Sequence, residues 1–114
     1  MVTAPQQTQP FISPEAYLQQ ETLAEEKHEY YDGEVLPVAG ASINHNRIVR
    51  NILVTLSIAF RGTVYEVLPS DMRLWVPARN AYTYPDVLVI AGEPQHHQDR
   101  DDTLTNPIML IEVL

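Results

Sequence analysis

The chain has 114 residues, a formal net charge of −8 and no cysteine. This length fits one small domain, and the absence of cysteine excludes disulfides and thiolate metal sites. The acidic balance argues against a protein that holds nucleic acid on a uniformly basic surface. No apolar run reaches the roughly 18–20 residues of a membrane-spanning helix, and the N-terminus lacks the basic and apolar regions of a signal peptide. We therefore expect a cytoplasmic protein.

The N-terminal part of the chain predicts a tail followed by a helix. Residues 1–12 are rich in Gln, Thr and Pro, a composition that predicts a mobile tail. Ser13 can cap a helix over residues 14–20, because Pro and Glu suit the first helical turn. A second short turn, or the same helix continued, is expected over residues 21–27.

A hairpin and a long helix are expected next. Asp32-Gly33 predicts a two-residue turn between two short strands, because Gly accepts a positive φ. Ser42 or Asn44 can cap the helix that follows, and Gly62 can end it. Its apolar residues recur at three- and four-residue spacing and form one face: Ile48, Val49, Ile52, Leu53, Leu56 and Phe60.

The C-terminal part reads as strands. The runs TVYEVL, MRLWVP and DVLVIAG are bounded by turn residues, and residues 93–106 read as a polar loop. Residues 107–114, PIMLIEVL, predict a last strand that is buried on both faces. The order of elements indicates an α/β or α+β domain over residues 13–114, with a central sheet flanked by helices. A last strand so apolar would leave unshielded surface, so we expect a truncated chain or, alternatively, a homodimer interface over residues 108–114.

Two carboxylates on these strands are the first candidates for chemistry. Asp86 begins one apolar strand, and Glu112 lies inside the last one. If the two strands are neighbours, the carboxylates can approach to about 5 Å. With a backbone carbonyl, they would offer the oxygen ligands that Mg²⁺ or Mn²⁺ prefers.

Each carboxylate also has a purely structural interpretation. Asp86 follows a proline at a strand start, where Asp often bonds to the nearby backbone. Glu112 is harder to explain in this way, because a carboxylate in a buried strand costs several kcal/mol unless it is paired or binds a metal. The burial cost therefore favours a functional role for Glu112.

Five segments together resemble a known family. They are EYYDGEV, the His45-Asn46 pair at the start of the long helix, PSDMRLWV, YPDVLVI and NPIMLIEVL. In this order they are similar to the restriction-endonuclease-like family of the Uma type, within the PD-(D/E)XK nuclease superfamily. The resemblance covers nearly all of residues 13–114, and it implies a restriction-endonuclease-like fold with a central mixed sheet, incomplete at the C-terminus.

The resemblance also implies a metal site. Pro85-Asp86 would be the PD element, and Asp86 and Glu112 would be ligands of Mg²⁺ or Mn²⁺, with the carbonyl of Val113 as a third ligand. In the superfamily a Lys lies two residues after the second acid, but this position is Leu114 here. In the Uma-type family a Lys commonly appears further along the chain.

Three other groups of residues are candidates for the same site. His45 is either a core or capping histidine or a group that points toward the carboxylates, and the resemblance favours the second interpretation. Of Glu29 and Glu34, either a solvated strand residue or a further acid of the site, Glu29 matches the family better. The His96-His97 pair lies in a polar loop with no third ligand at fixed spacing, so we interpret it as solvated.

Three functions compete. The first is a metal-dependent endonuclease acting on DNA, with His45 or a Lys outside this chain assisting proton transfer. Arg47, Arg50 and Arg61 would then meet the nucleic-acid backbone, although each is otherwise an ordinary solvated arginine. The second is a catalytically inactive nuclease-like binding module, which the acidic charge and the absence of the Lys favour. A hydrolase of a smaller phosphate ester is the third.

Overall fold

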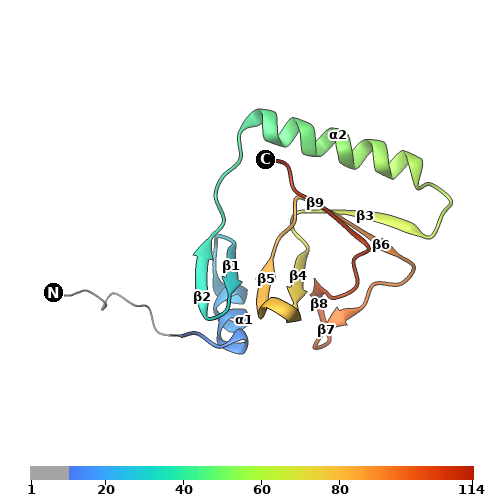
Figure 1. The fold of residues 1–114 in the computed structure, drawn as a ribbon. Coiled ribbons are helices and arrows are strands. Elements are labelled where there is room, and N and C mark those ends of the chain that lie inside the picture. The colour runs from blue at the N-terminus through green and yellow to red at the C-terminus, as the bar shows by residue number, and fades with distance from the viewer. Residues whose placement is uncertain (1–10) are drawn as a thin grey trace. The chain divides into compact units, whose positions relative to one another are not determined.

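The computed structural model describes residues 11–114, and the elements along the chain are labelled in Figure 1. The chain divides into two compact units, Met1–Val38 with Val76–Tyr82 and Ala39–Trp75 with Thr83–Leu114, and each is described by itself. The predicted tail falls outside the described residues as far as residue 10. Ile12 is described, and its N–H donates to the carbonyl of Gly33 at 3.0 Å.

The first unit opens with helix α1, Pro14–Leu23. The hydroxyl of Ser13 accepts from the N–H of Ala16 at 3.1 Å, so the predicted cap is confirmed. The helix runs past residue 20 because no helix breaker stands between Gln20 and Leu23. The continued-helix alternative is therefore the correct one, though only as far as Leu23.

A hairpin follows, as the Asp32-Gly33 pair predicted. Strand β1, His28–Tyr31, pairs with β2, Glu34–Pro37, in an antiparallel register. Asp32 and Gly33 join them with φ of 43° and 97°. These left-handed values match a two-residue turn whose twist suits the flanking strands. Strand β5, Ala81–Thr83, was not predicted, and it pairs with the other edge of β1.

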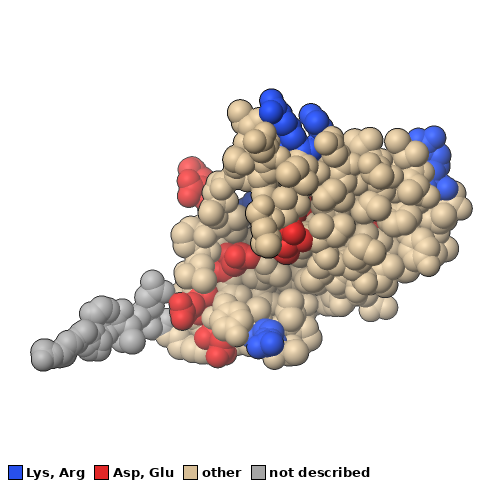
Figure 2. Space-filling view, turned by 45° about the horizontal axis from the view of Figure 1, so that its top comes forward, with Lys and Arg blue, Asp and Glu red and all other residues tan. Residues whose placement is uncertain are grey.

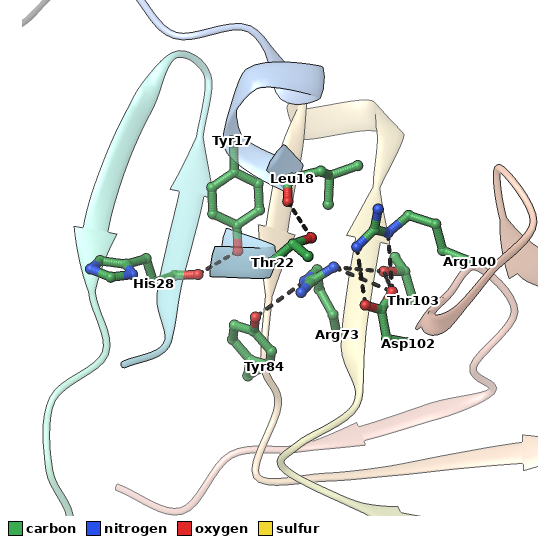
Figure 3. A network of polar contacts seen from close by, with 9 residues as sticks. All are labelled: Tyr17, Leu18, Thr22, His28, Arg73, Tyr84, Arg100, Asp102 and Thr103. Atoms are coloured by element: carbon green, nitrogen blue, oxygen red, sulfur yellow. Dashed lines mark hydrogen bonds and ion pairs between the residues drawn. The ribbon is translucent and has the colours of Figure 1, made fainter. Parts of the chain in front are cut away.

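Three tyrosines form the core of this unit. Tyr17, Tyr30 and Tyr82 are all buried, and their ring centroids lie 5.2–6.0 Å apart. Buried phenols need hydrogen-bond partners. The hydroxyl of Tyr17 donates to the carbonyl of His28 (Figure 3), and that of Tyr30 donates to the carbonyl of Ile12 at 2.5 Å. The tyrosines therefore tie α1 and the entry segment to the hairpin.

The second unit contains an antiparallel sheet in the order β3-β6-β9. Its strands are Tyr65–Pro69, Val87–Ala91 and Met109–Ile111. Four residues of the central strand, 87–90, are fully buried, because helix α2 packs on β3 and β6 and a cluster with Leu104 covers β6 as well. Burial on both faces explains why this strand is continuously apolar rather than alternating.

Helix α2, Ile43–Ala59, supplies one layer of the second unit. Of the two predicted caps, Ser42 is the correct one: its hydroxyl accepts from the N–H of His45 at 3.0 Å. The helix ends at Ala59 with Phe60 as its C-cap, and Gly62 lies in the following turn. None of its residues is fully buried, so its predicted apolar face is only partly covered.

The predicted polar loop over residues 93–106 is wrong. It contains β7, His96–His97, and β8, Arg100–Leu104, which pair as a hairpin. Their turn uses Gln98 and Asp99 at φ of 54° and 59°, a pair without the glycine that signals such turns. Strand β8 also runs parallel to β4, Arg73–Val76, through the pairs Arg73↔Thr103 and Leu74↔Leu104. Parallel and antiparallel pairs occur together, so this sheet is mixed. With the helices, the strands make an α+β fold, as predicted.

The last strand differs from its prediction. It was expected over residues 107–114 and buried on both faces, but β9 covers Met109–Ile111 and pairs only with β6 in the part of the chain described. Ile108, Met109 and Leu110 are 57%, 46% and 48% exposed. Together with α2, β9 lines an apolar cavity of about 350 Å³. The expected unshielded apolar surface is therefore present, because the described residues cover these apolar side chains only in part.

A buried arginine holds β4 to β8. Arg73 is 6% exposed, and Figure 3 shows its guanidinium between Tyr84 and the β8 residues Asp102 and Thr103. It donates to the hydroxyl of Tyr84 at 3.1 Å and to that of Thr103 at 3.0 Å, and it lies 3.4 Å from Asp102. Asp102 also contacts Arg100 at 3.1 Å. A buried cation is tolerated only with such partners.

This cluster predicts an acid-sensitive contribution to stability. Burial raises the pKa of Asp102, but hydrogen bonds from Arg100 and Thr103 and the charges of Arg73 and Arg100 outweigh it and lower the pKa below 3.8. The stabilisation is therefore complete above that usual value and is lost as pH falls through the lower folded pKa. In urea titrations between pH 2 and 6, Asp102→Asn should lose less stability on acidification than the parent chain. We expect a difference below about 1 kcal/mol, because the side chain of Asp102 is 46% exposed. Asp101→Asn, which replaces the exposed neighbour, should behave as the parent chain does.

A helix long and apolar enough to cross a membrane was not found among residues 11–114.

Candidate functional site

Three segments of the second unit meet at one point. They are the first turn of α2, the start of β6 and the residues that follow β9, and Figure 1 shows the C-terminus beside the first turns of α2. Each segment brings one group: the imidazole of His45, the carboxylate of Asp86 and the main chain of Val113. Residues far apart in sequence thus form one cluster.

The start of α2 positions His45. Ser42 binds the N–H of His45, which fixes the first turn, and the side chain then extends toward β6 and β9. Its Nε2 lies 3.2 Å from Asp86 Oδ2 and 3.1 Å from the carbonyl oxygen of Val113. A carbonyl oxygen accepts only, so Nε2 carries the hydrogen. The imidazole therefore donates to both oxygens.

Asp86 is held by three neighbours at the entry to β6. Pro85 before it is buried and fixes the backbone that leads into the strand. The N–H of Val113 donates to Asp86 Oδ2 at 2.8 Å, and the same oxygen accepts from His45. The side chain of Asp86 remains 18% exposed, so solvent and solutes can still reach this carboxylate.

Glu112 lies beside the cluster. The ladder between β6 and β9 ends with the pair Val87↔Ile111, so the next position along each chain places Asp86 opposite Glu112. Opposed residues of an antiparallel pair have neighbouring side chains. However, Glu112 is exposed and lies past the end of β9. The cost of burying a charge therefore gives no support to a functional role for Glu112. Its place in the register agrees with the predicted convergence, and its role as a ligand stays a prediction.

The remaining candidates lie on strands outside the segments that form this cluster. Glu29 lies on β1 opposite Leu36, in the first unit, so its role stays a prediction. His96 and His97 form β7, and the ring of His97 stacks on Trp75 at 5.0 Å. Among residues 11–114, no group of three or more His, Cys, Asp or Glu side chains has a metal-binding arrangement.

The donor set of the cluster nevertheless fits a hard divalent cation. One carboxylate oxygen and one carbonyl oxygen converge on the same nitrogen of His45 within 3.2 Å. Oxygen donors of these two kinds are those that Mg²⁺ and Mn²⁺ select. Asp86 and Val113 would hold such an ion, and Glu112, the neighbour in register, would be the further carboxylate.

The basic residues are dispersed rather than gathered in one patch on the drawn face. On the face drawn in Figure 2, Lys and Arg form small separate groups, and most of the surface carries neither charge. On α2, Arg47 lies 3.4 Å from the amide oxygen of Asn44, and Arg50 lies 3.1 Å from that of Asn51. These contacts leave both guanidinium groups at the exposed surface of the helix. A nucleic-acid contact by these arginines stays a prediction.

Residues 14–114 match the Uma2 family, which is described as "Putative restriction endonuclease". The chain belongs to the Uma2 family. This finding confirms the resemblance that the five sequence segments indicated, and it supports a nuclease-like function at the level of the family.

The chain is similar to two curated relatives in sequence and to one solved structure in fold. The uncharacterized proteins sll1609 and slr1290 of Synechocystis are 46% and 36% identical over 98 and 107 residues, which are 86% and 92% of this chain. The chain spans about half the length of both relatives, 55% and 54%.

The solved structure is described as a "putative nuclease belonging to DUF820" from Anabaena variabilis. It superposes with a TM-score of 0.70 at 15% identity, over 90% of this chain and 58% of its own length. This likeness confirms the restriction-endonuclease-like fold.

Sequence reasoning missed two features of this Uma2 domain. The first is the N–H of Val113, which fixes the carboxylate of Asp86. Main-chain donors leave no signal in the residue type, so no pattern could have revealed it. The second is Arg73, whose hydroxyl partner Tyr84 lies two residues before Asp86. A charged residue within the apolar run MRLWV was a visible signal of a buried network.

Proposed function

We propose that this Uma2 chain provides the metal-binding site of a Mg²⁺- or Mn²⁺-dependent endonuclease that hydrolyses DNA phosphodiester bonds. One observation carries the proposal: Asp86 Oδ2 and the carbonyl oxygen of Val113 both lie within 3.2 Å of Nε2 of His45. Oxygen ligands brought together at the start of one strand and the end of its neighbour suit a hard cation. The family description and the fold give the nuclease class its support.

Each group has a separate task in this proposal. Asp86 and the carbonyl of Val113 bind the cation, and Glu112 adds a second negative charge from the next register position. A bound divalent cation would supply Lewis acidity toward a phosphodiester oxygen and an activated water. His45 offers an N–H donor near the site, and a donor that no longer binds these two oxygens can orient a water or a phosphate oxygen.

A second candidate is a nuclease-like binding module without catalysis. The observation that favours it is Leu114, which occupies the position of the superfamily Lys and offers no charge or proton. In that case the carboxylates would still bind a cation, but DNA would remain uncut. Metal binding and cleavage therefore need separate measurements.

Titration calorimetry with MgCl₂ and MnCl₂ tests the predicted role of Glu112. We expect Glu112→Gln to weaken cation binding by at least about tenfold, because the loss of a ligand should cost no less than the loss of an outer-sphere partner. Glu93→Gln, a matched change at another exposed glutamate, should bind as the parent chain does. Equal affinity of Glu112→Gln and the parent would remove Glu112 from the site.

Cleavage of supercoiled plasmid distinguishes the two candidates. The parent chain is incubated with plasmid and Mg²⁺ or Mn²⁺, and a parallel reaction contains EDTA. Nicked product that depends on the cation supports the endonuclease. Cation binding without nicking, in a folded sample, supports the binding module.

A further inference from the structure

His45 binds the two oxygen atoms that a bound cation would need. Its Nε2–H donates to Asp86 Oδ2 and to the carbonyl of Val113, at 3.2 and 3.1 Å. These are the same two oxygens that the proposed function assigns to Mg²⁺ or Mn²⁺. The partially positive hydrogen of His45 and a divalent cation therefore need the same lone pairs.

The hydrogen bonds to Asp86 and Val113 also hold the imidazole ring of His45 in place. Nδ1, the other ring nitrogen, is buried and has no hydrogen-bond partner among residues 11–114. The side chain is 23% exposed, so it borders solvent rather than filling the core. If the two oxygens turn toward a cation, no other hydrogen bond of the described chain keeps the imidazole in place.

We infer that His45 closes this site in the absence of metal, and that a divalent cation binds Asp86 and Val113 by displacing the imidazole from both oxygens. The inference rests on the proposed function, because it uses the same two ligands. It assigns His45 a role opposite to that of a metal ligand. The measured affinity of the parent chain then includes the cost of breaking the His45 contacts, as for any protein whose binding-competent state is a minor one.

Calorimetry with His45→Ala gives the first test. Without the competing N–H, Mg²⁺ should bind about tenfold more tightly than to the parent chain, the factor that corresponds to one hydrogen bond of ordinary net strength. His96→Ala replaces an exposed histidine of β7 in the same unit, and its affinity should equal that of the parent. In metal-free buffer, His45→Ala should unfold at a lower temperature, because three segments lose a shared contact.

The outcomes separate this inference from the proposed function. Weaker or unchanged Mg²⁺ binding by His45→Ala overturns the inference and leaves the proposed function standing. If neither the parent nor His45→Ala binds Mg²⁺, the proposed metal site fails and the inference fails with it.

A measurement on the parent chain avoids any folding defect of the variant. In ¹H–¹⁵N spectra tuned to imidazole nitrogens, saturating Mg²⁺ should shift the Nε2 signal of His45 and speed exchange of its hydrogen with water. The signals of His96 should not move. A His45 signal that stays unchanged while calorimetry reports Mg²⁺ binding would overturn the inference.

Discussion

Replacing Asp86 by Asn should weaken the binding of Mg²⁺ or Mn²⁺ by at least about 100-fold, the upper end of what loss of an outer-sphere partner costs. Asp86 supplies the one carboxylate oxygen that both His45 and Val113 contact. Asn removes the negative charge, but its side-chain oxygen can still accept the N–H of Val113. The change should therefore remove the cation while leaving the strand pairing of the second unit intact.

Calorimetry of Asp86→Asn, with circular dichroism to verify the fold, measures this effect. Asp101→Asn is the matched control, because it makes the same change at an exposed aspartate of β8. If Asp86→Asn binds either cation as tightly as the parent chain, Asp86 is a structural cap and the metal-dependent nuclease proposal fails. Cation-dependent plasmid nicking should disappear together with binding.

Leu88→Ala should give the largest loss of stability among single changes in the second unit. Leu88 is fully buried on β6, the strand between β3 and β9, and packs in a cluster with Ile90 and Leu104. Truncating a buried leucine to alanine costs about 2–5 kcal/mol, because the lost contacts are only partly recovered by relaxation. For a domain of this size, that is a large share of the total free energy of unfolding, about 5–15 kcal/mol.

Leu110 provides the matched control for this measurement. It is the register partner of Leu88 on β9 and is 48% exposed. Leu110→Ala should therefore cost clearly less than Leu88→Ala, below about 1.5 kcal/mol, since a half-exposed side chain buries less apolar area. Urea titrations at constant pH give both values. Equal losses for the two variants would contradict the burial that the structure assigns to β6 and β9.

Local features of the fold were predictable because their causes are local. Ser13 and Ser42 each cap a helix with a hydroxyl three residues from the N–H that they bind. Asp32-Gly33 forms its turn because both residues tolerate a positive φ. These interactions span only a few residues, so the sequence around them contains all the information that determines them.

Strands without a local signal were missed. The segment with Gln98 and Asp99 reads as a polar loop, yet it turns between β7 and β8 because β8 pairs with β4. Thr103 and Leu104 are buried by that pairing. Strand formation here depends on a partner 30 residues away (Arg73↔Thr103), and no periodicity within residues 93–106 indicates it.

The candidate site shows the same division. The carboxylates of Asp86 and Glu112 could be selected from the sequence because both adjoin apolar strands. A carboxylate buried there costs free energy unless it is paired or binds a ligand, so it is a candidate for function. Their neighbourhood follows from the antiparallel register of β6 and β9, in which Val87 pairs with Ile111. The exposure of Glu112 did not follow, because burial depends on which elements cover a strand.

By itself, the sequence determined the two helices, their serine caps, the hairpin turn and the family to which this Uma2 chain belongs. All of these depend on residue types at short, fixed spacings. Only the tertiary structure decided that His45 donates to both Asp86 and Val113. Asp86 lies 41 positions after the histidine in the sequence, and Val113 lies 68 positions after it. A contact of this kind forms when packed elements bring distant residues together, and its geometry is a property of the packing rather than of any one stretch of sequence.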